Sequence, residues 1–342
     1  MEVIEIMQED EKFDLFLRNN HNFIYHTFTF KKFIEESFDC HYRILAAIDN
    51  DHILTILPIV EVKSKIFGSK IISSAYLEYG GFAGEESGVK PIIDYLQEKY
   101  STNLDYLEIR GGNEKFNYLL SSIMLKKDHY KRFVLSLSSE EETWKNIQHS
   151  KRKAINRALS VLEVKEISLN DLNEFYQLYC QNMRRFGSPP YNLRYFQKFY
   201  EHIVSRKMGK IFGAYYQGKL VAGLLGFCYN QRVHILISVS DPKLQEHRPN
   251  DAVHWKFIQW ACQQGYTEFD FGRVREESGQ FEYKQKWGPK LMELPSYFLL
   301  WRAKEAPFVD PKKHKLVVKL WQRMPLFVTR LIGMKLRKGL GI

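Results

Sequence analysis

The sequence predicts an α/β protein with mixed sheets, built from two units of the same element order and a basic amphipathic tail. Apolar runs of period two alternate with amphipathic helical patterns along most of the 342 residues. The order helix, helix, hairpin, strand, helix, strand occurs twice. Residues repeat as well, because 104–110 resembles 267–273 and both stretches end in arginine. We place the units at 1–140 and 141–305 and the tail at 306–342.

The first unit opens with two helical patterns and continues into strands. The turn Asp49-Asn50-Asp51 lies between two Val/Ile/Leu runs, which is typical of a hairpin. The predicted elements are helices over 10–19 and 27–37, strands over 42–48, 52–60 and 69–75, a helix over 89–100, a strand over 104–110, a short helix and a strand over 130–137.

The second unit follows a helix over 141–159 whose second half is strongly basic. Its hairpin turns at Gln217-Gly218-Lys219, where glycine permits the tight turn. The other predicted elements are helices over 171–185 and 193–207, a strand over 232–240, a helix over 251–264, a strand over 267–271, a helix over 279–287 and a strand over 294–301.

Composition excludes several classes of protein. The 4 cysteines are scattered without a CxxC pair, which indicates a reducing, cytoplasmic setting. The 11 histidines show no HxxxH or HExxH spacing, so we predict no metal site. The chain starts MEVIEIMQEDEKF, which is acidic where a signal peptide is basic, and no run of about 18 apolar residues could span a membrane. We therefore expect a cytoplasmic protein with no tightly bound cofactor.

The net charge of +10 favours anionic partners, but it is concentrated in the tail. Nine Lys or Arg and no acidic residue occur over 312–338, and the rest of the chain is close to neutral. Apolar residues such as Leu316, Leu320, Phe327 and Leu331 recur there at helical spacing. This pattern is typical of a helix at an anionic lipid surface, here the inner face of the membrane; the alternative is a tail packed on its own domain. We expect no stable nucleic-acid complex.

The most informative segment is 269–288, FDFGRVREESGQFEYKQKWG. An aromatic strand ends at Gly272-Arg273, a polar loop follows, and Tyr283, Lys284 and Trp287 come next in a short helical pattern. A strand that presents an arginine at its carboxyl end, followed by a lysine-bearing helix, predicts an anion-binding edge.

The element order and several motifs resemble the GNAT acyltransferase fold in tandem, the architecture of the Fem aminoacyltransferases and the exopolysaccharide-associated Fem-related proteins. The resemblance implies transfer of an acyl or aminoacyl group to an amine of a cell-envelope saccharide or lipid-linked precursor, in peptidoglycan or exopolysaccharide biosynthesis. It rests on the following segments: 65–68 with 79–81, 150–158, 184–191, 269–273 with 281–288, and 321–326.

Two departures from the family leave the acyl donor open. Coenzyme-A-binding GNAT domains carry a glycine-rich loop whose amides hold the pyrophosphate, whereas 243–250 has no glycine here. The helical arm of the longer peptidoglycan members is also missing. The donor is aminoacyl-tRNA, as the resemblance implies, or acyl-CoA. Two alternatives stay open: an acyl-CoA-dependent N-acetyltransferase on a nucleotide sugar or polysaccharide, and a non-catalytic scaffold for exopolysaccharide assembly.

Three residues are predicted to be catalytic. The resemblance assigns Lys284 to the lysine of the family's aromatic-lysine pair, where its ammonium stabilises a developing oxyanion; the alternative is a solvated helix lysine. Arg273 is expected to clamp a phosphate or carboxylate, or else to pair with Glu276, Glu277 or Asp270. Asp270 is the candidate general base, with a structural pairing to Arg273 as its alternative.

Seven residues are predicted to bind substrate. Two aromatic residues are expected to line an acyl or sugar pocket; the alternative is that they belong to the core. Three cations of one basic helix are expected to bind a diphosphate; the alternative is a solvated helix face. A further arginine and tyrosine border the 187–190 loop, which closes over a substrate or merely joins two helices. These residues are Tyr283 and Trp287, then Lys151, Arg152 and Arg157, then Arg185 and Tyr191.

Overall fold

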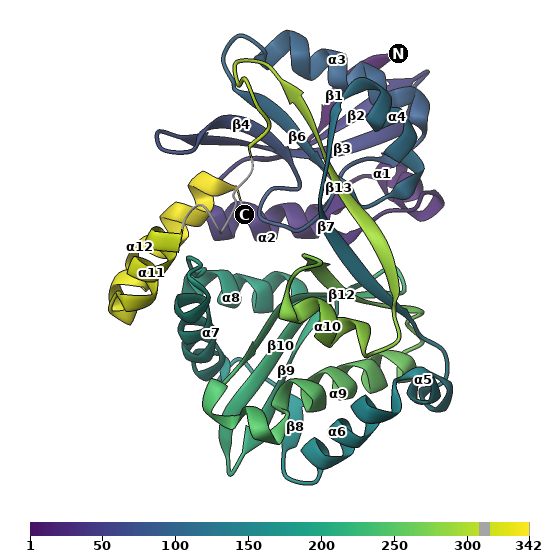
Figure 1. Ribbon diagram of the computed structural model, residues 1–342. Helices are drawn as coiled ribbons and strands as arrows, with labels where there is room; N and C mark the ends of the chain where they lie inside the picture. The colour runs from purple at the N-terminus through teal and green to yellow at the C-terminus, as the bar shows by residue number, and fades with distance from the viewer. Residues whose placement is uncertain (308–314, 342) are drawn as a thin grey trace. The chain divides into compact units, whose positions relative to one another are not determined.

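The computed structural model describes residues 1–307 and 315–341, and these form two units (Figure 1). Unit 1 comprises Met1–His129, Leu294–Val309 and Lys335–Ile342, and unit 2 comprises Tyr130–Glu293 and Asp310–Met334. The part of the predicted tail at 308–314, with Lys312 and Lys313 of its basic run, lies outside the described residues, as does Ile342.

Unit 1 is a mixed sheet with helices, in the strand order β1-β2-β3-β4-β6-β13. Its strands are antiparallel neighbours except β4 and β6, which are parallel. The helices and strands are β1 Glu2–Ile6, α1 Glu11–Asn19, α2 Phe28–Phe38, β2 Tyr42–Asp49, β3 His52–Ser64, β4 Gly68–Ser73, β5 Ala83–Gly84, α3 Val89–Tyr100, β6 Tyr106–Arg110, α4 Asn117–Ile123 and β13 Lys290–Leu300. Strand β13 belongs to unit 1 from Leu294 on.

Unit 2 repeats this plan in the strand order β7-β12-β11-β10-β9-β8. Its one parallel pair is β11 with β12. The helices and strands are β7 Leu125–Ser136, α5 Glu140–Asn146, α6 His149–Leu159, β8 Glu163–Glu166, α7 Leu172–Phe186, α8 Leu193–Phe199, β9 Gly209–Tyr216, β10 Lys219–Tyr229, β11 Arg232–Ser240, α9 Pro249–Gln263, β12 Glu268–Val274, α10 Gly279–Gln285, α11 Lys315–Arg323 and α12 Leu326–Leu340. Of these, β7 belongs to unit 2 from Tyr130 on and α12 as far as Met334.

The predicted fold class, mixed α/β in two similar units, is confirmed, and some elements differ. The strand expected to end the first unit, 130–137, belongs to unit 2, and 294–301 belongs to unit 1. The helix expected over 141–159 is two helices, because Ile147 is extended at φ −73° and ψ 136°. The short strands β1 and β8 were not predicted, since half-exposed polar alternation over 4 or 5 residues gives little signal.

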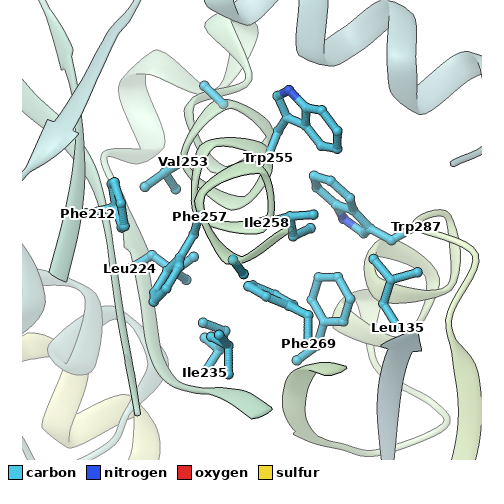
Figure 2. Close-up of a cluster of buried hydrophobic side chains, with 14 of the residues drawn as sticks. Leu135, Phe212, Leu224, Ile235, Val253, Trp255, Phe257, Ile258, Phe269 and Trp287 are labelled. Carbon is cyan, nitrogen blue, oxygen red and sulfur yellow. The ribbon is translucent and has the colours of Figure 1, made fainter. Parts of the chain in front are cut away.

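The core of unit 2 fixes the helices that carry the predicted motif. Figure 2 shows Phe257 and Ile258 of α9 among residues of the sheet. Phe257 and Phe269 meet edge to face with ring centroids 5.8 Å apart. Trp287, which follows α10, is fully buried in the same cluster. Burial of such large side chains contributes about 1.5–3 kcal/mol each, so α9 and α10 are held firmly against β12.

Candidate functional site

The parallel strands β11 and β12 pair briefly and then diverge. Their register runs from Arg232 opposite Glu268 to His234 opposite Asp270. Beyond this point β11 pairs, among the described strands, only with β10, and β12 pairs with β7 after a register shift between Asp270 and Arg273. Backbone polar groups at the diverging ends therefore become available to side chains or to a ligand.

Lys284 lies at this diverging edge. Its Nζ donates to the backbone carbonyls of Gly272 and Arg273, each at 3.0 Å. Gly272 has φ 74°, a conformation that glycine adopts without strain, and it lies within the register shift of β12. The irregular backbone thus turns two carbonyls toward one ammonium. The alternative of an ordinary solvated lysine does not describe Lys284, which is half-buried and held at two points.

The short helix α10 packs on the core through Phe281 and Tyr283 and is anchored at its end as well. Trp287 is buried just beyond the helix, and Gly288 at φ 77° ends it. A Cβ at Gly288 would lie 2.7 Å from the carbonyl oxygen of Asn146, so only glycine fits there. These constraints fix the position of Lys284 relative to β12.

Behind α10 lies a buried ion pair that joins α6 to α9. Lys151 Nζ is 2.7 Å from Asp251 Oδ1, and the two side chains are only 6% and 4% exposed. The same ammonium lies 3.9 Å from the ring centre of Tyr283 and 5.1 Å from that of Trp287. Burial lowers the pKa of Lys151, and the carboxylate of Asp251 opposes that shift. Lys151 therefore supports the aromatic residues of the motif from within the protein.

His254 completes this buried cluster from α9. Its Nδ1 is 2.7 Å from the carbonyl oxygen of Asn250, and because a carbonyl only accepts, Nδ1 carries the hydrogen. Tyr283 Oη is 3.4 Å from the same nitrogen. Burial, together with nearby Lys151 and Lys284, lowers the pKa of His254 to about 3. Burial also raises the pKa of Tyr283 well above its usual value, with Asp251 adding to the effect, so the phenol keeps its proton at neutral pH.

The lowered pKa of His254 predicts a loss of stability in acid. In the unfolded chain histidine titrates near 6.5, so below that pH the unfolded state binds a proton that the folded state refuses until about pH 3. We expect the contribution of His254 to be full above pH 6.5 and to fall by about 1.4 kcal/mol per pH unit below it. Denaturant unfolding of the wild type and His254→Gln between pH 7 and pH 4.5 measures this. A variant with the same pH slope as the wild type would contradict the prediction.

Asp270 and Arg273 both lie on β12, as predicted. Asp270 is fully buried, its Oδ2 lies 2.9 Å from Arg132 Nη1, and its Oδ1 accepts from the backbone N–H of Gly272 at 2.9 Å. Asp270 thus pairs with Arg132, and its pairing with Arg273 stays a prediction. The guanidinium of Arg273 lies 4.9 Å from the ring centre of Tyr130. This geometry favours Asp270 as a support for the backbone turn at Gly272, and its role as a base stays a prediction.

The counterpart of Arg273 in unit 1 shows what a purely structural arginine does. Arg110 is buried, donates to the carbonyl oxygens of Leu77 at 2.6 Å and Gly341 at 2.9 Å, and pairs with Glu108 at 3.1 Å. Arg273 is half-buried instead. The two units thus share the backbone arrangement of the motif, whereas the surroundings of the two arginines differ.

The basic helix α6 does not present its three predicted cations together. Lys151 points into the core, Arg152 is half-buried and Arg157 is exposed. Arg157 is six positions after Lys151 in the helix, which places the two on different sides. Lys151 is engaged by Asp251, and the diphosphate site on this helix stays a prediction.

The two residues predicted to bind substrate beside the loop after α7 also differ in burial. Tyr191 is buried, stacks on Tyr195 with ring centroids 4.0 Å apart, and donates its backbone N–H to Tyr179 Oη at 3.0 Å. Arg185 is exposed, and its Nη2 donates to Asn182 Oδ1 at 2.9 Å. Tyr191 is a core residue of this corner, and Arg185 lies at the surface.

Two residues of the cluster were not identified from the sequence, namely Asp251 and His254. Both lie on α9 three residues apart, so they share a helix face. An acidic residue and a histidine at this spacing, among the apolar residues Ala252, Val253 and Phe257, would have been the available signal.

The start of α9 differs from a pyrophosphate site. Arg248 has φ 55° before the helix, and Pro249 at its first position has no N–H. The next amides are used internally, because Asp251 and Ala252 both donate to the carbonyl of Arg248, at 2.9 and 3.3 Å. The first turn also carries the carboxylate of Asp251, which repels an anion.

Comparisons with known proteins agree with this geometry. Residues 143–285 match the family profile of the acetyltransferase (GNAT) domain. The structure of FemX is similar with a TM-score of 0.70 at 13% identity, over 93% of this chain and 100% of that one. A tandem GNAT protein from the clavulanic acid biosynthesis pathway gives a TM-score of 0.58 at 8% identity, over 90% and 99%. The C-terminal domain of an Agrobacterium fabrum protein named as a lysylphosphatidylglycerol synthetase gives 0.58 at 10%, over 78% and 86%.

A search of curated proteins finds no match to the chain. Within residues 1–307 and 315–341, no helix combines the length and apolar character needed to cross a bilayer. The matched profile covers most of unit 2, from α5 to the end of α10, and so includes Lys151, His254 and Lys284. The chain therefore carries an acetyltransferase (GNAT) domain at 143–285 and has the tandem fold that its sequence motifs predict.

Proposed function

We propose that the protein transfers an aminoacyl group from aminoacyl-tRNA to an amine of a cell-envelope saccharide or lipid-linked precursor, in peptidoglycan or exopolysaccharide biosynthesis. The observation that carries the proposal is the ammonium of Lys284, held by the carbonyls of Gly272 and Arg273 where β11 and β12 diverge. FemX and a lysylphosphatidylglycerol synthetase are similar in fold, and their names point toward aminoacyl transfer to envelope molecules. A lipid-linked acceptor also places the reaction at the inner face of the membrane.

The chemistry needs a positioned ester, an anion-stabilising group and proton transfer. The acceptor nitrogen forms a bond to the ester carbon, and the carbonyl oxygen becomes an oxyanion. Lys284 would stabilise that oxygen, since an ammonium in a partly dehydrated site acts more strongly than in water. When the intermediate collapses, the bond from carbon to the ribose oxygen breaks. The nitrogen loses one proton and the ribose oxygen gains one.

The surroundings of Lys284 suit this role. Tyr283 and Trp287 lie beside it, and neither carries a charge at neutral pH. Lys151 and Asp251 hold the aromatic pair from behind without leaving net charge in the interior. The ammonium of Lys284 is thus held on a fixed helix beside uncharged side chains. Because these side chains do not screen its charge, its electrostatic attraction for the oxyanion stays strong.

The start of α9 favours aminoacyl-tRNA over acyl-CoA as donor. A pyrophosphate would need free amides there, but Pro249 has none and the amides of Asp251 and Ala252 bond to Arg248. The second candidate, acyl-CoA-dependent N-acetyl transfer to a nucleotide sugar or polysaccharide, is favoured only by the acetyltransferase description of the matched profile.

Titration with coenzyme A tests the choice of donor. We expect isothermal titration calorimetry of the full chain to give no saturable binding tighter than about 1 mM, because the pyrophosphate amides are occupied. A binding constant in the micromolar range would favour the acyl-CoA candidate and contradict the proposed donor.

A further inference from the structure

Helix α11 and the part of α12 up to Met334 pack on unit 2. A Cβ on Gly187, which ends α7, would lie 2.5 Å from Val318 of α11, and one on Gly333 of α12 would lie 2.6 Å from Pro190. Trp321 is buried on the same side. The loop after α7 and these two helices therefore form a close contact that fixes which side of α11 and α12 faces the protein.

The opposite side of the helices carries large apolar residues that no part of the described chain covers. All five are between 62% and 78% exposed, and two pairs of them, Leu316 with Leu320 and Phe327 with Leu331, are four residues apart. We call this set the outer apolar face: Leu316, Val317 and Leu320 of α11 with Phe327 and Leu331 of α12. Single exposed apolar residues are normal in proteins, but five on two consecutive helices indicate a surface for interaction.

The charge around the outer apolar face selects the kind of partner. Residues 315–341 contain seven Lys or Arg and no Asp or Glu. Lys315, Lys319 and Arg323 are exposed among the apolar residues of α11. On the neighbouring corner, Arg185 and Phe186 are exposed as well. A second copy of the chain would bring like charges together on this face, whereas an anionic surface would neutralise them.

We propose that the outer apolar face lies on an anionic lipid surface. Leu316, Leu320, Phe327 and Leu331 enter the boundary between headgroups and acyl chains, and the surrounding lysines and arginines contact lipid phosphates. The buried side of the helices, with Trp321, stays on unit 2. This binding does not require the acyl transfer proposed above, so the two proposals fail independently.

Vesicle co-sedimentation of the full chain tests the lipid surface. Vesicles of equal parts phosphatidylglycerol and phosphatidylcholine are compared with phosphatidylcholine alone, at low and high salt. We expect binding to the anionic vesicles only, weakened by salt. The Leu320→Ser/Phe327→Ser variant should bind at least about tenfold more weakly, and Lys315→Gln/Lys319→Gln about tenfold more weakly. Tyr118→Ser, at a residue of α4 that is 89% exposed, is the matched control and should bind like the wild type.

Three outcomes would overturn the proposal. The first is a wild-type chain that binds neither vesicle, and the second is a Leu320→Ser/Phe327→Ser variant that binds as the wild type does. The third is concentration-dependent self-association in sedimentation velocity that this variant abolishes, which would assign the face to a second copy. Thermal melts followed by circular dichroism confirm that the variants are folded, as expected for exposed positions.

Discussion

Replacing Lys284 with methionine is expected to lower kcat for aminoacyl transfer about 100- to 1000-fold while KM changes little. The side chain keeps its length and loses its charge, so the oxyanion loses its stabilising partner. The carbonyls of Gly272 and Arg273 also lose their donor. The measurement is steady-state transfer to the envelope precursor with the variant and the wild type at equal folded concentration.

Lys286 supplies the matched control for this experiment. It lies two residues further along, in the turn that ends α10, and it is exposed. Lys286→Met should retain transfer within a factor of about three, since an exposed charge acts weakly through water. Wild-type rates in Lys284→Met would remove Lys284 from the mechanism. Equal losses in both variants would indicate a general effect of charge near the site.

Replacing Asp251 with asparagine is expected to lower the free energy of unfolding by about 3–5 kcal/mol. The change leaves the ammonium of Lys151 buried without its carboxylate, and desolvation of an unpaired ion is costly. Guanidinium-induced unfolding followed by tryptophan fluorescence measures the loss. The double variant Lys151→Met/Asp251→Leu should recover most of it, because the buried charge and its partner are both removed.

The exposed pair Lys145 and Glu141 is the control for Asp251→Asn. These side chains lie 2.6 Å apart on α5 and are 65% and 78% exposed. Glu141→Gln should cost less than about 1 kcal/mol, as is usual for surface pairs. If Asp251→Asn costs no more than Glu141→Gln, the buried pair does not hold the cluster together.

The fold was predictable because its signals are local and occur twice. Period-two runs bounded by turn residues such as Asp49-Asn50-Asp51 and Gln217-Gly218-Lys219 define hairpins, and helix α3 has the bounds predicted. The assignment of β7 to unit 2 was not predictable. It depends on pairing with β12, between residues more than 100 positions apart, and period alone does not encode partners.

The site was predictable in part, for a similar physical reason. The motif 281–288 predicted Lys284, Tyr283 and Trp287 as site residues. This was possible because a strand, the loop after it and the short helix that follows are consecutive in the chain and stay close in space. The partners of these residues come from α6 and α9 and were found only in the structure. Lys151 was predicted to bind a diphosphate or to lie on a solvated face, because a sequence shows composition but not which side of a helix is covered.

A direct transfer assay tests the central claim most plainly. The full chain is incubated with labelled aminoacyl-tRNA, or with labelled acyl-CoA, and with nucleotide-linked and lipid-linked envelope precursors that carry a free amine. We expect label to move to the precursor from aminoacyl-tRNA, in an amide that survives mild base where the donor ester does not. Label that moves from acyl-CoA but not from aminoacyl-tRNA, or that moves from neither, would contradict it.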